Sequence, residues 1–562
     1  MASHAKSSAT GLEAGAMPGM GTGTFRRMRP DLPAANRLSK DCIMAIAVAM
    51  TQKDDAGESI DHAEPVDENP TIPAGFTYFG QFVDHDLTLD PTPLSVSSGS
   101  LTNALEDFRT PALDLDCVYG RGKDDQPYMY KGVELRLGEA QLDHNGGPIQ
   151  NDKDLHRLPD GTAILGDKRN DENKIVSQVQ GAMIRLHNKI VRQDALLLRA
   201  GARLVVGPDW SQDQADDSRF RAAVAIVRWH YQWVVLNDYL DRICEPGMVS
   251  EVLNPNGAPR LLNYLHTAAE YPYMPLEFSG AAFRFAHSMV RPSYALNIDI
   301  GTDVTRVMRN GKSEPVTPRI PTFSNGKPDS NLNGFVDGTL PPNWAIDWGY
   351  FLPGLNPKVG KDFKVPQPSY RIDANLVSPL RELPEFKDVI PPVFRNLAFR
   401  NLARGQQLGL PSGETMSNAF GITPLGPNVL WTAGSSRITQ AAIDAMSEDA
   451  RKSFDPIDGA RRDVAKTFLD HGLRGNTPLW YYILREAEYY GVTNDPNEEM
   501  VILGGQHLGP LGSRIVAETL VAIVWLDETS YLNCKPGFQP YPEISDNGPL
   551  TLDKLLAYAL TP

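Results

Sequence analysis

One segment constrains the fold of this chain more than any other, because it is apolar on nearly all of its faces. Residues 220–240 read FRAAVAIVRWHYQWVVLNDYL, and a helix with that pattern is buried inside a large core. A second helix is predicted from Glu172 onward, where apolar residues recur at three-and-four spacing up to residue 190. No strand-rich region of comparable length competes, so the sequence predicts a mainly α protein with little β structure. Further helical patterns cover residues 281–291, 393–406, 438–449, 458–471, 477–490 and 513–526.

Long irregular connections separate the predicted helices. The 562 residues include 47 glycines and 45 prolines, and residues 311–345 and 352–392 are proline-rich with almost no periodicity. These connections are too extensive to be linkers between small domains, so we expect them to wrap one large helical core, an arrangement that suits a bound prosthetic group. Residues 1–35 are predicted to be a flexible tail, since nothing there could bury enough surface to offset the entropy of ordering.

The composition excludes several classes of protein. The chain has 54 basic and 69 acidic residues, a net charge of −15, which argues against a nucleic-acid partner. Its four cysteines are far apart, which excludes a disulfide-dense scaffold and a CxxC metal site. The apolar run at residues 42–50 is too short to cross a bilayer, and no secretory signal is recognised. We therefore expect a soluble protein without a signal peptide or membrane insertion, cytoplasmic by default, with secretion by a signal-less route left open.

The first candidate site lies in residues 75–90, which read GFTYFGQFVDHDLTLD. On a helix, Gln81, Asp84 and His85 share one face, while Asp86 turns about 100° away. Taken alone, the stretch fits a functional site no better than a structural one, which would be a core histidine with a carboxylate partner or a pair of solvated acids.

A second candidate site follows in residues 110–120, TPALDLDCVYG. Oxygen donors alternate along it at Thr110, Asp114 and Asp116, with the Ala112 carbonyl between them. Together with one acid from elsewhere in the chain, such a loop suits a hard cation such as calcium, which takes six to eight oxygens. By itself it is a weak signal, because acidic loops are usually just solvated.

With these stretches in view, the sequence resembles the animal-type haem peroxidases of the peroxidase–cyclooxygenase superfamily. Six stretches carry the resemblance, in the family's order across roughly residues 71–411: GQFVDHD, TPALDLDCVYG, GDKRNDE, LHNKI, FRFAHSMVRP and RNLARGQQLGLP. Helical segments through about residue 530 are also compatible. Because residues from 85 to 401 would converge on one haem, the resemblance implies a single large helical domain over residues 36–562.

The resemblance implies a role for each matched residue on the peroxide side of the haem. His85 matches the distal histidine that moves a proton from peroxide to the leaving oxygen. Arg169 matches the cation that stabilises charge as the O–O bond breaks, although local sequence alone favours a surface residue. Gln81 matches an amide near the peroxide and halide pocket. Asp84 and Glu172 match the carboxylates that form ester bonds to haem, so covalent attachment of haem b is an expectation.

On the opposite side, His287 matches the proximal histidine that ligates the iron, while its apolar neighbours also fit a satisfied core histidine. Asn401 matches the residue that accepts a hydrogen bond from the other ring nitrogen of that histidine. Arg284 and Arg404 would pair with haem propionates, or could equally be surface arginines.

The resemblance also supplies a complete calcium ligand set. The matching positions are Asp86, Thr110, the Ala112 carbonyl, Asp114 and Asp116. Many relatives have serine where Asp116 stands, which makes that ligand the departure from the family pattern. Because Asp86 directly follows His85, calcium would brace the distal helix as a structural support.

The implied activity is a haem peroxidase that reduces hydrogen peroxide to water through a ferryl intermediate and oxidises halide, thiocyanate or phenolic donors. Two alternatives stay open. A fatty-acid dioxygenase of the same superfamily would need a tyrosine three residues before the proximal histidine, where Arg284 stands. A non-enzymatic calcium-dependent scaffold is the other. The sequence identifies neither the physiological reductant nor the oligomeric state.

Overall fold

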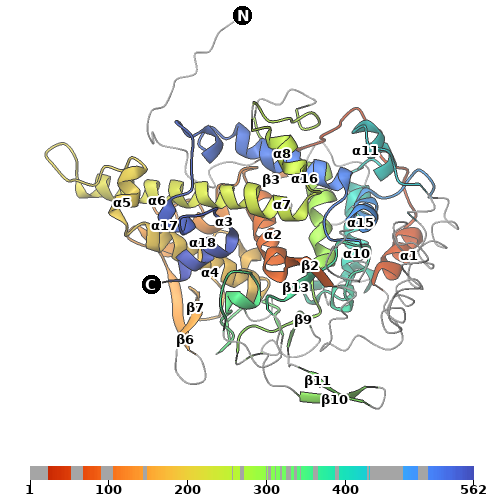
Figure 1. Ribbon diagram of the computed structural model, residues 1–562, viewed down its shortest axis with the longest axis horizontal. Helices are drawn as coiled ribbons and strands as arrows, with labels where there is room; N and C mark the ends of the chain where they lie inside the picture. Colours follow the sequence, from red (N-terminus) through yellow and green to blue (C-terminus); the bar gives the residue numbers. More distant parts are fainter. Residues whose placement is uncertain are drawn as a thin grey trace, which may run out of the picture.

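The computed structural model describes most of the chain and is shown in Figure 1. The described residues are 23–51, 68–89, 106–142, 148–255, 257–265, 271–298, 300, 305–309, 312–316, 319–323, 331–334, 338–341, 343–357, 365–386, 392–426, 430, 473–491 and 504–561. Their fold is mainly α-helical, as predicted. Two of the predicted helices, residues 438–449 and 458–471, lie outside the described residues.

The predicted all-apolar helix is the longest described element. It comprises α6 (Gln212–Val234), a π-helical turn (Val235–Tyr239) and α7 (Leu240–Ile243). α6 begins eight residues before the predicted segment, because Ser211 and Gln214 form a reciprocal capping box at its polar first turn. The helix packs on α4 (Lys174–Ile190) and is the long horizontal element of Figure 1.

Two further elements face each other and carry the candidate site. α2 (Ala74–Leu87) contains the first acidic motif, and η5 (Ala282–Met289) contains His287. Residues 281–291 were predicted as an α-helix; the described helix there is a 3-10 helix, which follows the short helix α9 (Leu276–Gly280). α2 packs against both η5 and α4. A side chain at Gly80 would overlap the Tyr239 hydroxyl, so glycine lets α2 approach the π-helical turn closely.

The remaining helices follow the predicted order. α10 (Leu397–Gln407), α15 (Leu479–Tyr490) and α16 (Pro510–Leu526) confirm the helical patterns at 393–406, 477–490 and 513–526 to within four residues at each end. The other α-helices are α1 (Lys40–Thr51), α3 (Asp116–Tyr119), α5 (Asp194–Arg199), α8 (Met248–Leu253), α11 (Gly413–Ala419), α17 (Pro542–Ser545) and α18 (Leu552–Leu560). The predicted connections 311–345 and 352–392 hold no α-helix in their described parts.

The strands are short and form small separate sheets. β1 (Gly23–Arg26) lies between β3 (Glu106–Asp107) and β8 (Met274–Pro275). β2 (Glu68–Pro73) pairs with β13 (Pro368–Tyr370), and β6 (Leu137–Leu142) pairs with β7 (Pro148–Leu155). The other pairs are β4 (Tyr130–Lys131) with β5 (Glu134–Leu135), β9 (Ser293–Tyr294) with β12 (Ile320–Pro321), and β10 (Thr305–Arg309) with β11 (Lys312–Val316).

The predicted flexible tail is wrong for its described part, residues 23–35. β1 pairs with two strands, and the side chains of Phe25 and Met28 are buried. The Met28 N–H donates to the buried Glu277 carboxylate at 2.8 Å, and the Arg29 guanidinium donates to the Ala419 carbonyl at 2.7 Å. Partners about 80, 250 and 390 residues away order this segment, which no local pattern could show. No helix among the described residues is long and apolar enough to span a bilayer.

Candidate active site

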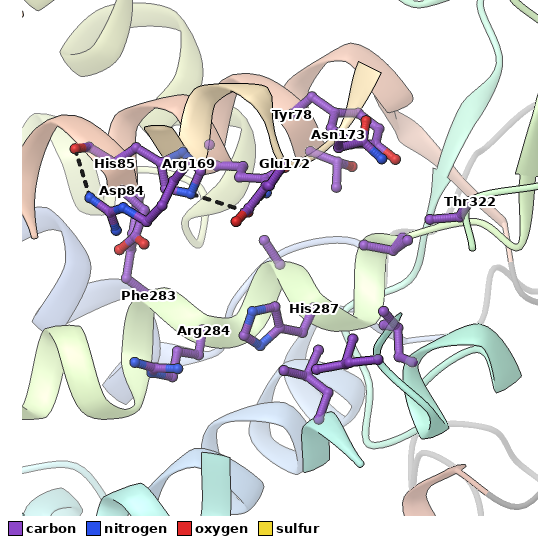
Figure 2. Close-up of a pocket in the computed structure, with 18 of the residues that line it drawn as sticks. Tyr78, Asp84, His85, Arg169, Glu172, Asn173, Phe283, Arg284, His287 and Thr322 are labelled. Carbon is purple, nitrogen blue, oxygen red and sulfur yellow. Dashed lines mark hydrogen bonds and ion pairs between the residues drawn. The ribbon is translucent and has the colours of Figure 1, made fainter. Parts of the chain in front are cut away.

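One cavity of about 310 Å³ lies between α2 and η5, and it gathers most of the residues predicted to act on peroxide or to bind haem. Figure 2 shows His85, Arg169 and Glu172 on one side of it, facing Arg284 and His287 across the opening. Apolar side chains complete the lining. The lining also includes Tyr78, Gln81, Asp84, Phe283, Val290, Leu380, Leu383 and Leu397. Helical spacing explains the first side, since residues 77, 78, 81, 84 and 85 repeat at three and four.

The ring of His85 is held through Nδ1, while Nε2 lies near a carboxylate. Its Nδ1 lies 2.7 Å from Asn170 Oδ1, and its Nε2 lies 3.4 Å from Glu172 Oε1. The side chain is buried, and only 4% of the residue surface is exposed. The ring therefore has a fixed orientation at the cavity wall.

Arg169 sits beside His85 on a 3-10 turn, η3 (Lys168–Asp171), which Asp167 caps. Its guanidinium donates to the backbone carbonyls of His85 and Thr88, at 3.1 and 2.5 Å, and pairs with Asp167 at 2.7 Å. Burial lowers the pKa of Arg169, but Asp167 more than offsets this, so the net pKa is raised. The same pairing holds the pKa of Asp167 below its ordinary value although burial raises it. Arg169 is thus a permanent cation at the cavity edge.

Gln81, Glu172 and Asp84 complete this wall of the cavity. Gln81 Nε2 donates to Glu172 Oε1 at 2.5 Å, and Thr88 Oγ1 donates to Asp84 Oδ1 at 3.2 Å. Glu172 immediately precedes Asn173, whose side chain caps α4 by accepting from the Ile175 N–H. Two carboxylates from different elements therefore reach one cavity, as the sequence predicted.

His287 lies on the opposite wall and is a neutral imidazole. Burial and the neighbouring Arg284 guanidinium lower the pKa of His287 to about 3. A neutral imidazole is the form that ligates a metal. Its ring also packs edge-on against Trp480 at 6.5 Å between centroids.

The contact between Asn401 and His287 is confirmed, but its predicted direction is wrong in this structure. Asn401 Nδ2 donates to His287 Nδ1 at 2.8 Å, whereas the prediction had Asn401 accepting. The cause is Arg284, whose Nη1 donates to Asn401 Oδ1 at 3.0 Å and so occupies the amide oxygen. A guanidinium only donates, so it fixes the amide with its nitrogen toward the ring.

Arg284 and Arg404, predicted as a pair, lie in different surroundings. Arg284 lines the cavity, and its Nε also donates to the Ser279 carbonyl at 2.8 Å. Arg404 is not among the cavity-lining residues, and its Nη1 donates to Gln407 Oε1 at 3.0 Å. The geometry thus brings only Arg284 to the cavity.

A cluster of three acids, Asp86, Asp114 and Asp116, lies behind the His85 wall. One carboxylate oxygen from each is within 4.8 Å of the others. Asp86 Oδ1 and Asp116 Oδ1 are buried without a hydrogen-bond partner in the described part of the chain. Burial is the main cause that raises the pKa of all three, and Asp114 adds to it at Asp86 and Asp116. The cluster therefore offers unpartnered oxygens to a cation, and a bound cation would favour the ionised carboxylates.

The other two predicted ligands, Thr110 and Ala112, lie on the loop that carries Asp114 and Asp116, and the Thr110 side chain contacts the cluster. Thr110 Oγ1 donates to Asp114 Oδ2 at 2.7 Å, and the Ala112 N–H donates to the Thr110 carbonyl at 2.8 Å. Leu115 has a φ of 63°, a costly conformation for leucine. This conformation brings the Leu115 N–H to Asp86 Oδ2 at 3.2 Å, so α2 and the loop meet at the cluster.

Sequence reasoning missed four residues that support these groups: Arg109, Asp167, Asn170 and Gln180. Arg109 pairs with Asp116 at 3.2 Å and with Asp167 at 2.8 Å, so it joins the acid cluster to the partner of Arg169. Asn170 contacts His85, and Gln180 contacts Asn170. Arg109 directly precedes the acidic loop and Asn170 directly follows Arg169, and that adjacency was the available signal.

The family model described as animal haem peroxidase matches residues 106–314 of the chain. The matched range contains Arg169, His287 and the acidic loop, while His85 and Asn401 lie outside it. No curated protein sequence matches the chain significantly.

Several solved structures are similar to the chain at low sequence identity. Peroxidase A from Dictyostelium discoideum is 15% identical, with a TM-score of 0.55 over 97% of this chain and 94% of that one. The fatty acid alpha-dioxygenase of Arabidopsis thaliana is 14% identical, with a TM-score of 0.48 over 92% and 72%. The Oryza sativa fatty acid alpha-dioxygenase with palmitic acid is 14% identical, with a TM-score of 0.49 over 94% and 78%. Residues 106–314 thus match the animal haem peroxidase family, and the chain shares its fold with the Dictyostelium peroxidase.

Proposed function

We propose that the chain is a haem peroxidase that reduces hydrogen peroxide to water and oxidises small donors such as halide, thiocyanate or phenols. The observation that carries the proposal is one cavity lined by His85, Arg169 and Gln81 on one wall and His287 on the other. A base, a fixed cation and an amide on one wall suit peroxide, and an imidazole on the facing wall suits an iron ligand. Each peroxide takes two electrons and two protons and becomes two waters, while the donors lose the electrons.

The residues present fit a haem. His287 is neutral, as an iron ligand must be, and the apolar side chains of the lining suit a porphyrin face. When bound, the haem supplies the redox chemistry and the site that binds peroxide. Asp84 and Glu172 both line the cavity, so we propose ester links through one or both of them.

Iron ligation sets a requirement on Asn401. His287 would hold the iron through Nε2, because Asn401 contacts Nδ1, and the ring proton would then sit on Nδ1. The amide of Asn401 must therefore present its oxygen to His287, and Arg284 must release that oxygen. We propose that Arg284 turns to a haem propionate and that the amide turns with it.

The residues of the His85 wall would then act on the peroxide. His85 Nε2 removes the first proton and returns it to the leaving oxygen. Arg169 stabilises the negative charge that develops as the O–O bond breaks, and its backbone and Asp167 contacts hold it in place without reorganisation. Gln81 orients the small molecule at the cavity wall.

We also propose that calcium binds Asp86, Thr110, the Ala112 carbonyl, Asp114 and Asp116. The support is the cluster of three buried carboxylates, in which Asp86 and Asp116 each have an oxygen without a hydrogen-bond partner in the described region. Because Asp86 follows His85 on α2, the cation would hold the last turn of that helix and the histidine with it.

A fatty-acid dioxygenase is the second candidate within the superfamily. It is disfavoured because the position three residues before His287 holds Arg284, where that chemistry needs a tyrosine. A calcium-dependent scaffold without activity is disfavoured because His85, Arg169 and His287 all line one cavity.

Haem loading followed by stopped-flow absorbance tests the proposal. His287→Ala should lose the Soret signature of histidine-ligated iron. Arg169→Ala should keep haem but react with peroxide at least 100-fold more slowly. Arg192→Ala, which removes an exposed ion pair with Glu134, is the matched control and should behave as the unaltered chain. Unchanged peroxide reactivity in both site variants would refute the proposal.

A further inference from the structure

A chain of buried amide groups runs from a backbone carbonyl to the ring of His85. Gln180 Nε2 donates to the Cys117 carbonyl at 3.4 Å, and Asn170 Nδ2 donates to Gln180 Oε1 at 2.9 Å. Asn170 Oδ1 then lies 2.7 Å from His85 Nδ1. Asn170 and Gln180 are both fully buried, so water does not compete for these groups.

The backbone carbonyl at the end of the chain fixes the direction of every bond in it. A carbonyl only accepts, so the Gln180 amide must turn its nitrogen to Cys117 and its oxygen to Asn170. Asn170 must donate from its Nδ2 to the Gln180 oxygen, so the Oδ1 of Asn170 faces His85. That oxygen only accepts, so the proton between the two residues belongs to His85 Nδ1.

We propose that Asn170, oriented by Gln180, is a positioning residue that holds His85 in the tautomer with Nδ1 protonated and Nε2 free. The consequence for catalysis rests on the proposed peroxidase function, whereas the tautomer itself does not. Nε2 is the ring nitrogen that can act at the cavity. It lies 3.4 Å from Glu172 Oε1, an oxygen that already accepts from Gln81.

A neutral imidazole without such a contact exists as two tautomers, with the proton on Nδ1 or on Nε2, and only one of them can act as a base toward the cavity. With the proton on Nε2, the ring would offer peroxide a donor where an acceptor is needed. The chain of amides removes that form before peroxide arrives.

The local sequence couples this device to Arg169. Asn170 follows Arg169 on the same 3-10 turn, and Gln180 comes from the second turn of α4. The turn that places the catalytic cation therefore also places the amide that orients the base.

Magic-angle-spinning NMR of the full chain with ¹⁵N- and ¹³C-labelled histidine tests the tautomer without any activity measurement. The signals of His85 are identified by their loss in His85→Gln. In the unaltered chain His85 should show protonated Nδ1, and in Asn170→Leu that signature should be lost or mixed with the other tautomer. Protonated Nε2 in the unaltered neutral ring, or no change in Asn170→Leu, would overturn the proposal.

Kinetics of the haem-loaded variants tests the consequence. The second-order rate with peroxide should fall at least 10-fold in Asn170→Leu and fall less in Asn170→Asp, which keeps an accepting oxygen toward His85 but cannot donate to Gln180. The rate of cyanide binding should fall in parallel, because hydrogen cyanide must also give up a proton. Full peroxide and cyanide rates in a folded Asn170→Leu would overturn the proposed consequence.

Two further variants separate positioning from general damage to α4. Gln180→Leu frees the Asn170 amide to rotate, so its rate should fall less than that of Asn170→Leu. Gln178→Leu removes a buried amide on the same helix whose contacts are Lys174, Trp344 and Ile346, away from His85. It should keep the full rate per bound haem. A chain that binds haem but ignores peroxide would refute the proposed function, while the NMR result would still decide the tautomer.

Discussion

Arg109→Leu is the substitution that most directly probes the acid cluster. Arg109 pairs with Asp116 at 3.2 Å and Asp167 at 2.8 Å, and donates to the Gly166 carbonyl at 3.1 Å. Only 11% of its side chain is exposed. Removal of one partner from a buried ion pair costs about 3–5 kcal/mol, because the other charge stays buried without compensation. Asp167 still has its ion pair with Arg169 in the variant, so we assign most of the lost stability to the unpaired Asp116.

Calcium should recover part of this loss. In the variant, Asp116 loses its paired cation, so a bound calcium ion compensates more charge than it does beside Arg109. A ligand at 100 times its dissociation constant stabilises by about 2.7 kcal/mol. The variant should therefore gain more stability from calcium than the unaltered chain.

Urea unfolding with chelator and with calcium measures both effects. Asp116→Ser and the double variant complete a cycle, and the double variant should be more stable than Arg109→Leu alone because no unpaired Asp116 remains. Arg192→Leu, at an exposed pair with Glu134, should cost less than about 1 kcal/mol. This reasoning would be refuted if the free energy of unfolding of Arg109→Leu lay within about 0.5 kcal/mol of that of the unaltered chain. It would also be refuted if the cycle gave no coupling energy between residues 109 and 116.

Two other predictions concern a remote buried acid and the haem linkage. Burial raises the pKa of Glu486 from 4.5 to about 8. The contribution of Glu486 to the free energy of unfolding is therefore complete below pH 4.5 and is lost as the pH rises through 8. The free energy of unfolding of Glu486→Gln, measured with urea relative to the unaltered chain, should therefore be up to roughly 5 kcal/mol more favourable at pH 9 than at pH 4. A difference between the two chains that does not change with pH would contradict this. Acid–acetone extraction should leave haem on the chain and release more of it from Asp84→Ala or Glu172→Ala; complete release from the unaltered chain would exclude ester links.

The sequence predicts well what periodicity and short motifs encode. The shared face of Gln81, Asp84 and His85 on α2 is confirmed by the cavity, and Asp86 turns away to meet the acidic loop. Residues in a motif keep their mutual geometry because one helix carries them. The acidic loop was likewise identified by its alternating oxygens, and it meets Asp86 as expected.

What the sequence does not predict depends on partners far along the chain. Arg109 and Asp167 are 58 residues apart, and His85 and Asn170 are 85 apart. The direction of the Asn401 amide depends on Arg284, 117 residues away, and so could not be read from either motif. Likewise β1 pairs with β3 and β8, which lie about 80 and 250 residues further along the sequence.

A stopped-flow and oxygen-electrode comparison of donors tests the central claim most directly. The haem-loaded chain is mixed with peroxide and bromide, iodide, thiocyanate or a phenol, and separately with an unsaturated fatty acid and oxygen. A peroxidase will consume peroxide and oxidise at least one of the small donors, without oxygen uptake on the fatty acid. Oxygen uptake with the fatty acid, and no peroxide-dependent oxidation of any small donor, would contradict the account.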